Sequence, residues 1–394
     1  MSIFNSLGSN YDLGFAVKAL FTSGKANLKG SLEKKYNGEA ILLFKGRQAI
    51  TLALKLLNLP TNSEVAINGF TCYAVYKAIE EANLMPVLID IPKDDLNFSA
   101  VYLEKKLKTN PNIKVVIVQN TLGFPCDIEA ISKICKEKNI FLIEDLAHCA
   151  GAKYENGVEA GRVGNFTILS FSQDKIIDVV SGGALIIRNK KYQKNYTDYF
   201  EEPPTRKTLT DKLYPTFTLI IRSTYGIGLG KFIHSFLKNL SLLSYPMDNN
   251  LYKMTSLPSW YQLLAQVTLY NLEKQIKHRK KIANIYKENI DKSILLNSVT
   301  DGTDFSSNLR FPIFTKKRDD LIKFLKIYNI YVSDIWYDAP IGPVRYMNKV
   351  NYQNDCPNSE KISSLILNLP THKNVSIEKA KFISERINEW LESL

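Results

Sequence analysis

The chain has 394 residues, of which 45% are hydrophobic and 23% charged, and its formal net charge is +12. These values exclude a disordered chain and allow a large buried core, which length alone would divide into two or three domains. The positive charge favours anionic partners, but no helix-turn-helix, zinc-finger or RNA-binding pattern organises the lysines, so we expect no nucleic acid partner.

The cysteines and the hydropathy pattern indicate the compartment. Five cysteines without a C-x-x-C pair favour a reducing cytoplasm over a disulfide framework and give no metal site. The amino terminus lacks the basic start and unbroken apolar core of a secretory signal. No window reaches the ~18 uninterrupted apolar residues of a membrane span. We expect a cytoplasmic protein, soluble or associated with a membrane only at its surface.

The first predicted elements suit an anion. A helix is predicted at residues 28–36 and a strand at 41–44, and Gly46, Arg47 and Gln48 then open an apolar-periodic helix. A glycine turn that opens a helix offers free backbone N–H groups and a positive dipole end, and both favour a phosphate.

From residue 64 onward, short apolar runs alternate with helical patterns. Strands are predicted at 65–68, 86–89 and 115–118, and helices begin near residues 73, 101 and 128. This alternation predicts an α/β fold with a mostly parallel sheet and helices on its faces. Ligands of such sheets bind at the carboxyl ends of the strands.

Two of these strand ends carry candidate catalytic residues. An apolar strand at 140–143 ends in Glu144-Asp145, and a second at 166–171 leads to Lys175 and then to Gly182-Gly183. Desolvation near a cleft disfavours the charged form of a lysine, and a neutral amine can condense with an aldehyde to form a Schiff base.

The ordered motifs resemble those of the DegT/StrS nucleotide-sugar aminotransferases, which use pyridoxal phosphate and have the fold called type I. The family carries E-D-x-A-[QH], a serine five residues before the cofactor lysine, and a Gly-Gly pair. In this chain the motifs are Glu144 to His148, Ser170 before Lys175, and Gly182-Gly183. The resemblance implies a large domain with a seven-stranded, mostly parallel sheet and a smaller carboxyl-terminal α/β domain.

The resemblance also implies a role for each residue. Lys175 holds pyridoxal phosphate, Asp145 pairs with its pyridinium nitrogen, His148 lies by its ring hydroxyl and Ser170 binds its phosphate. A carboxylate beside the ring nitrogen keeps that nitrogen protonated, which the electron-withdrawing chemistry of the cofactor requires.

The chain departs from the family pattern in three places. Arg47 and Gln48 stand where the family has Thr and Ala against the phosphate; backbone contacts can survive this change and a hydroxyl contact cannot, and Arg47 either adds charge or points outward. Cys72, followed by Tyr73, stands where an aromatic residue stacks on the ring, and either side chain is a candidate for that place. Thr255-Ser256 stands near the family's asparagine, which reaches the cofactor phosphate of the neighbouring subunit.

The segment least like the family is an insertion at about 200–255. Residues 212–247 contain no acidic residue, and apolar residues recur there at helical spacing between Leu229 and Leu243, with Lys231 and Lys238 elsewhere around the helix. This helix either packs against the protein or a second subunit, or lies in a membrane interface.

The remaining chain predicts a second unit. A long helix at 260–286 carries His278 to Lys281, expected to be a solvated face, and Trp336-Tyr337 resembles the family's substrate-facing His-Tyr pair. We place a large cofactor-binding domain at 1–255 and a linking helix with a small domain at 256–394.

The function that this resemblance implies is transfer of an amino group, from glutamate, to a nucleotide-linked keto-sugar in amino-sugar or surface polysaccharide biosynthesis. Family dehydratases replace the lysine with histidine, and Lys175 argues against that activity. Two alternatives are open: a membrane-peripheral enzyme acting on a lipid-linked or hydrophobic acceptor, and a non-catalytic regulator that retains the fold. The family also implies a homodimer.

Overall fold

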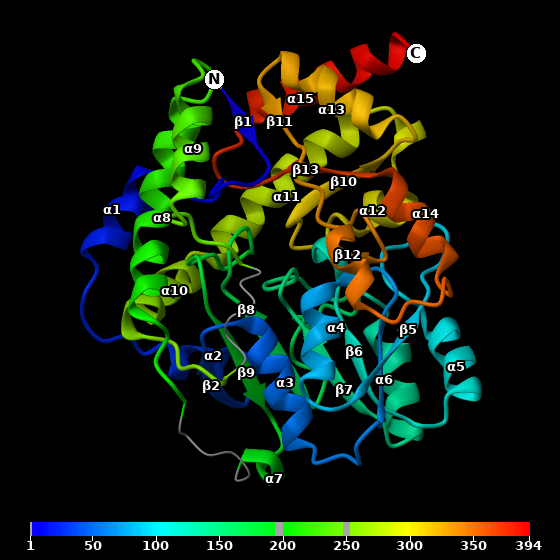
Figure 1. Cartoon of the computed structure of the whole chain (residues 1–394). Helices are drawn as coiled ribbons and strands as arrows, with labels where there is room; N and C mark the ends of the chain where they lie inside the picture. The colour runs from blue at the N-terminus through cyan, green and yellow to red at the C-terminus, as the bar shows by residue number, and fades with distance from the viewer. Residues whose placement is uncertain (1, 194–199, 247–252) are drawn as a thin grey trace.

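A seven-stranded sheet is the centre of the structure, a computed structural model that describes residues 2–193, 200–246 and 253–394 (Figure 1). The strand order is β2-β9-β8-β7-β6-β3-β5, and β9 alone runs antiparallel to its neighbours. The predicted seven-stranded, mostly parallel sheet is therefore confirmed. The strands are β2 (Glu39–Leu43), β3 (Glu64–Asn68), β5 (Met85–Ile89), β6 (Ile113–Val118), β7 (Phe141–Asp145), β8 (Phe166–Ser170) and β9 (Gly183–Ile187).

Helices cover both faces of this sheet, which explains why its strands read as continuous apolar runs. Successive side chains of a strand point to opposite faces. In β6, Val115 and Ile117 pack with the helices α3 and α4, whereas Val116 and Val118 pack with α2, α5, α6 and α10. The helices are α2 (Leu28–Tyr36), α3 (Gly46–Leu56), α4 (Tyr73–Glu80), α5 (Ala100–Thr109), α6 (Ile128–Glu137) and α10 (Ser259–Tyr270).

A second hydrophobic cluster lies in the carboxyl-terminal part, around the antiparallel pair β10 and β13. The first strand, β1 (Ile3–Phe4), pairs with β11 there, so the amino terminus adds to this part of the structure. The division into domains at residues 255 and 256 stays a prediction. The elements are α11 (Leu272–Asn289), α12 (Asn297–Gly302), β10 (Arg310–Phe314), α13 (Arg318–Ile327), β11 (Ile330–Tyr331), α14 (Pro357–Leu365), β13 (Ile366–Pro370) and α15 (Ile377–Glu392).

Short elements complete the chain. A two-residue parallel pair joins β4 (Thr71–Cys72) to β12 (Ile341–Gly342), bringing the loop before α4 against the carboxyl-terminal part. Single turns of 3₁₀ helix lie at Thr121–Gly123 and Lys292–Ile294, and a longer one at Val344–Lys349.

The predicted long helix at 260–286 is wrong in one respect, because it breaks at Asn271 into α10 and α11. The Asn271 side chain donates to the carbonyl of Val267 one turn earlier, at 2.8 Å. Such bonding of an asparagine to nearby backbone competes with helix continuation.

The insertion forms a helical hairpin that packs on α1 (Leu13–Phe21), as Figure 1 shows. It consists of α8 (Thr205–Ser223) and α9 (Leu229–Asn239), after the short α7 (Lys190–Gln193). Residues 194–199 and 247–252, which fall in the region predicted to be unlike the family, lie outside the described residues.

The predicted apolar stripe of α9 is divided between the protein and solvent. Leu237 and Leu243 are buried against α1 and α8, whereas Phe232 and Phe236 are 69% and 53% exposed. No helix in the described part of the chain combines the length and the hydropathy that a membrane crossing needs.

Candidate active site

The candidate residues gather where β7 and β8 end. These neighbouring parallel strands place Asp145 and Ser170 at the same edge of the sheet, and the loop after β8 brings Lys175 back to it. His148 follows Asp145 in the turn after β7, and its ring Nε2 lies 2.9 Å from Lys175 Nζ. The structure therefore brings together the three residues predicted to be catalytic.

The contacts of His148 define the proton distribution. Its Nδ1 accepts a hydrogen bond from the backbone N–H of Leu122 at 3.2 Å, so in the neutral ring the proton is on Nε2. That N–H then donates to Lys175 Nζ, which requires a lone pair on the nitrogen. The arrangement fits a neutral lysine, the form that reacts as a nucleophile.

Burial favours the same protonation states. It lowers the pKa of Lys175, against the opposing influence of Cys72 and Asp145. It also lowers the pKa of His148 well below its usual value, and the neighbouring Lys175 adds to that effect. A buried amine therefore faces a buried imidazole, and burial favours the neutral form of each.

Asp145 is a nearly fully buried carboxyl group. Its Oδ1 accepts from the backbone N–H of Ala147 at 2.9 Å, and it makes no other hydrogen bond to the described residues. Burial raises its pKa to about 6, although the charge of Lys175 acts in the opposite direction. A carboxylate that is costly to ionise alone is stabilised by a cationic ring nitrogen beside it.

Three backbone segments converge on the other side of this site. A Cβ atom on Gly46 would lie 2.9 Å from Cβ of Ser170, and one on Gly183 would lie 2.7 Å from the backbone N of Gly46. Helix α3 starts at Gly46 without a side-chain cap, and this start lies against Ser170 at the end of β8. This arrangement suits a phosphate.

The side chains of Arg47 and Gln48 are engaged elsewhere. Arg47 donates to the carbonyl of Pro246 at 3.0 Å, and Gln48 donates to Thr255 Oγ1 at 3.2 Å. The backbone of this turn can still contact a phosphate, and these bonds hold the two side chains toward residues 246 and 255. Thr255 contacts the turn of its own chain, where the family's asparagine reaches a second subunit.

Cys72 and Tyr73, the two candidates for the stacking position, have different surroundings in the structure. The ring of Tyr73 stacks on that of Tyr346 at 4.6 Å in a buried cluster. Cys72 lies close enough to Lys175 and Tyr337 to influence the pKa of both groups. The structure therefore places Cys72 beside Lys175, whereas Tyr73 packs with Tyr346.

The carboxyl-terminal part contributes further residues. The Tyr337 hydroxyl lies 3.3 Å from His148 Nδ1, and Lys175 Nζ lies 4.6 Å from the centre of the Trp336 ring. Both residues therefore lie beside the candidate catalytic residues. Arg310 also reaches Trp336, and sequence reasoning missed it; an arginine inside the apolar run 309–313 was the available signal.

The expectation of a solvated face at His278 to Lys281 is wrong for Arg279. This residue is 3% exposed, and its guanidinium donates to the Leu309 carbonyl at 3.1 Å, to Thr371 Oγ1 at 3.0 Å and to Asn10 Oδ1 at 2.9 Å. Its partners come from distant parts of the chain, so the local charge pattern could not reveal them.

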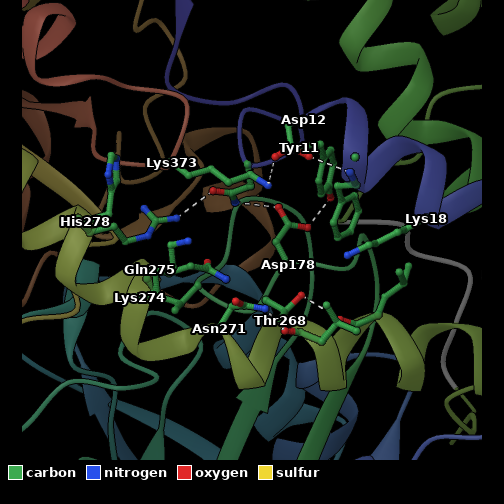
Figure 2. A pocket seen from close by; sticks show the side chains of 17 residues that line it. Tyr11, Asp12, Lys18, Asp178, Thr268, Asn271, Lys274, Gln275, His278 and Lys373 are labelled. Atoms are coloured by element: carbon green, nitrogen blue, oxygen red, sulfur yellow. Dashed lines mark hydrogen bonds and ion pairs between the residues drawn. The ribbon is translucent and has the colours of Figure 1, made fainter.

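Figure 2 shows a pocket of about 560 Å³ that Arg279 helps to line, between α1 and the helices α10 and α11. Ile176 and Asp178, just after the candidate lysine, belong to its lining, but Lys175 does not. Asn10 and Tyr11 donate to the Asp178 carboxylate. Lys18 and Lys274 have no acidic partner among the described residues and leave the pocket positive.

These residues fit pyridoxal phosphate, the cofactor that the resemblance implies. Lys175 supplies a neutral amine, Asp145 a carboxyl oxygen without a hydrogen bond to the described residues, and the turn at Gly46 a cradle that a Cβ atom would fill. The amine, the acid and the anion cradle lie at one edge of one sheet, which is where a flat ring with a phosphate arm could contact all three.

Comparisons with known proteins agree with the motifs. A profile of the DegT/DnrJ/EryC1/StrS aminotransferase family matches residues 32–388. The chain is 26% identical to GDP-perosamine synthase of Escherichia coli O157:H7 over 93% of this chain and 91% of that protein. It is 24% identical to dTDP-4-amino-4,6-dideoxy-D-glucose transaminase of Shigella dysenteriae, over 89% and 86%. Helicobacter pylori PseC, an aminotransferase involved in the biosynthesis of pseudoaminic acid, superposes with a TM-score of 0.73 at 16% identity over the whole of both chains.

Proposed function

Since the chain belongs to the DegT/DnrJ/EryC1/StrS aminotransferase family, whose enzymes depend on pyridoxal phosphate, we propose that it transfers an amino group from glutamate to a nucleotide-linked keto-sugar. The observation that carries the proposal is the 2.9 Å contact between Lys175 Nζ and His148 Nε2, beside the buried Asp145. The chain's similarity to sugar transaminases supports the acceptor class. The product would serve amino-sugar or surface polysaccharide biosynthesis.

The residues divide the chemistry among them. Bound pyridoxal phosphate withdraws electrons from the carbon that loses a proton. Lys175, whose pKa burial lowers, would take that proton as general base and return it as general acid. Asp145 would keep the ring nitrogen protonated, and His148 contacts the Lys175 amine through Nε2. Backbone N–H groups at Gly46 bind the phosphate.

The positive pocket beside the loop after Lys175 supports an anionic carrier on the sugar. Lys18 and Lys274 face it from α1 and α11 (Figure 2). Basic side chains around a cleft attract phosphorylated ligands.

Turnover tests the proposal. Purified protein, L-glutamate and each of a panel of nucleotide-linked keto-sugars are incubated, and release of 2-oxoglutarate is measured. We expect release only when an acceptor keto-sugar is present. Protein that binds no pyridoxal phosphate and releases no 2-oxoglutarate with any acceptor would refute the proposal and favour the non-catalytic regulator.

Replacing Asp145 with asparagine should stabilise the cofactor-free protein at neutral pH while lowering turnover by about 10²- to 10³-fold. The folded pKa of about 6 lies above the unfolded value of about 3.9, so the wild type loses about 2 to 3 kcal/mol as pH rises from about 4 to 6. Asparagine cannot ionise and avoids this loss. The measurement is urea unfolding of both apo-proteins at pH 4 and pH 7.5.

The comparison uses Asp94→Asn, at an exposed position, as the control. The difference in free energy of unfolding between Asp94→Asn and the wild type should be the same at pH 4 and at pH 7.5. A stability difference between wild type and Asp145→Asn that does not change with pH would contradict the assignment.

We propose that the enzyme is a homodimer, as the family implies. The contact from Gln48 to Thr255 lies within one chain, so the phosphate turn does not depend on a second subunit in the way the family pattern does. Light scattering after size-exclusion chromatography gives the mass of the assembly.

The outward face of α9 favours a second candidate function, a membrane-peripheral enzyme acting on a lipid-linked or hydrophobic acceptor. Phe232 and Phe236 project from this face, and Lys231 and Lys238 are exposed beside them. Residues 212–247 contain no acidic side chain. If two copies of the chain met through this face, the lysines of one copy would face those of the other, with no carboxylate from residues 212–247 between them. An anionic lipid surface therefore complements the face better than a second copy does.

Neutralising Lys231 and Lys238 to glutamine should weaken binding to phosphatidylserine vesicles by about thirtyfold, because each cation near an anionic surface contributes about 1 kcal/mol. The measurement is co-sedimentation at 50 and 200 mM salt. The matched control neutralises Lys133 and Lys136, two exposed lysines of α6. Equal losses in both double variants, or a dimer that dissociates when α9 is changed, would refute the membrane contact.

A further inference from the structure

Arg310 is a buried cation within the candidate active site. It is the first residue of β10, is 3% exposed, and stands with its guanidinium carbon 4.9 Å from the centre of the Trp336 ring. Lys175 Nζ lies 4.6 Å from the centre of the same ring. The reactive amine and the guanidinium therefore both contact one indole, and they lie close enough for Arg310 to lower the pKa of Lys175.

The guanidinium is not satisfied by the protein. Its only ion pair among the described residues is with Asp174, whose Oδ1 lies 3.9 Å from Nη2, beyond hydrogen-bond distance. Arg310 donates no side-chain hydrogen bond to a described residue, and its Nη1 is buried without a partner. A buried donor without a partner costs about 1–3 kcal/mol, so such a group calls for an explanation.

Arg279 shows how this protein satisfies a buried guanidinium when the role is structural. It is equally buried and donates to three oxygen atoms, from Leu309, Thr371 and Asn10. Burial lowers the pKa of Arg310, and the carboxylates of Asp174, Asp334 and Asp178 oppose that effect. These carboxylates offset part of the charge, but Arg310 donates a side-chain hydrogen bond to none of them, so its fork of donors stays open among the described residues.

We propose that Arg310 binds a carboxylate of the amino donor, an inference that rests on the proposed function. The planar fork of a guanidinium matches a carboxylate in a bidentate geometry, and the flat indole of Trp336 supports that plane from one side. In an α-amino acid the carboxylate is attached to the carbon that carries the amine. A donor whose nitrogen reacts beside Lys175 therefore brings its carboxylate to the same indole wall.

The test compares the reaction of L-glutamate with the cofactor-loaded enzyme in the wild type, Arg310→Gln and Arg310→Lys. The change of cofactor absorption after rapid mixing gives the apparent affinity and the limiting rate. Arg310→Gln removes the charge and should lower the ratio of the limiting rate to the apparent dissociation constant by on the order of a hundredfold. Most of this loss should come from weaker binding of L-glutamate. Lysine, which keeps the charge but lacks the fork, should recover only part of the loss.

Ligand binding gives a readout that does not depend on turnover. Glutarate, which carries the carboxylates of glutamate but no amine, should raise the Tm of the wild type and not that of Arg310→Gln. Glucuronate is the second probe. A Tm shift with glucuronate and none with glutarate would assign the carboxylate to the sugar and overturn the proposal.

Arg188→Gln is the matched control, because it removes a largely buried guanidinium that the protein already satisfies through Gly164, Gly161 and Thr167. We expect it to lower Tm without a selective loss toward L-glutamate. If Arg310→Gln and Arg310→Lys only lower Tm in the same way, Arg310 is structural and the proposal fails. A wild type that binds glutarate through Arg310 but never reacts with L-glutamate would instead refute the proposed function.

Discussion

Lys175→Ala is expected to abolish transamination, with a loss of roughly ten-thousandfold or more. The alanine variant lacks both the amine that attaches the cofactor and the base that moves the proton, and His148 Nε2 loses its partner. The measurements are 2-oxoglutarate release and covalent retention of pyridoxal phosphate after borohydride treatment. The wild type should retain the cofactor covalently, and Lys175→Ala should not.

The control for this prediction is Lys153→Ala, at an exposed lysine outside the site. It should leave activity and covalent retention as in the wild type. Covalent retention at another lysine in the Lys175→Ala variant, together with full activity, would remove Lys175 from the reaction. The amine-to-imidazole contact would then be a structural one.

Glu144→Ala is expected to lower the free energy of unfolding by about 3–5 kcal/mol and Tm by roughly 10 °C. The Glu144 side chain has no exposed area, and its carboxylate accepts from the Tyr154 hydroxyl at 2.8 Å and from the backbone N–H of Gly161, Val163 and Gly164 at 2.6–2.7 Å. It also pairs with Arg188 at 3.4 Å. Alanine would leave the three N–H groups without this acceptor and would remove the charged partner of Arg188, which keeps its bonds to the carbonyls of Gly161 and Gly164.

Differential scanning calorimetry of the wild type, Glu144→Ala and Glu155→Ala checks the prediction. Glu155 is exposed, so its replacement should leave Tm within about 1 °C. The fraction of Glu144→Ala that remains folded should keep its affinity for L-glutamate, because the carboxylate points to the loop at 161–164 and not to Lys175. Loss of turnover at unchanged Tm would contradict the structural role.

The sequence predicted the sheet well because both of its faces are buried. Strands such as β6 are apolar along their whole length, and this signal is local. The same holds for the strand ends at Asp145 and Ser170. In contrast, α8 contains Pro215 and mixed polar residues, and its helical state depends on packing against α1, far away in the sequence.

The candidate site was predictable only where one chain segment carried the information. Lys175, Asp145 and His148 follow from motifs within one stretch of the sequence. Trp336 was singled out through the resemblance alone, whereas Arg310 was missed, because it lies more than a hundred residues away and reaches the site only through folding. Tyr73 shows the converse, since its sequence position suggests the site while its ring packs on Tyr346.

The close approach of backbone at Gly46 and Gly183 limits how this enzyme can diversify. Neither position has room for a methyl group, since a Cβ on Gly183 would overlap the first residue of α3. Side chains larger than that of glycine are therefore excluded at both positions by steric overlap. New substrate preferences in descendants of this chain have to arise on the opposite wall, where Trp336 and its neighbours are side chains that selection can exchange.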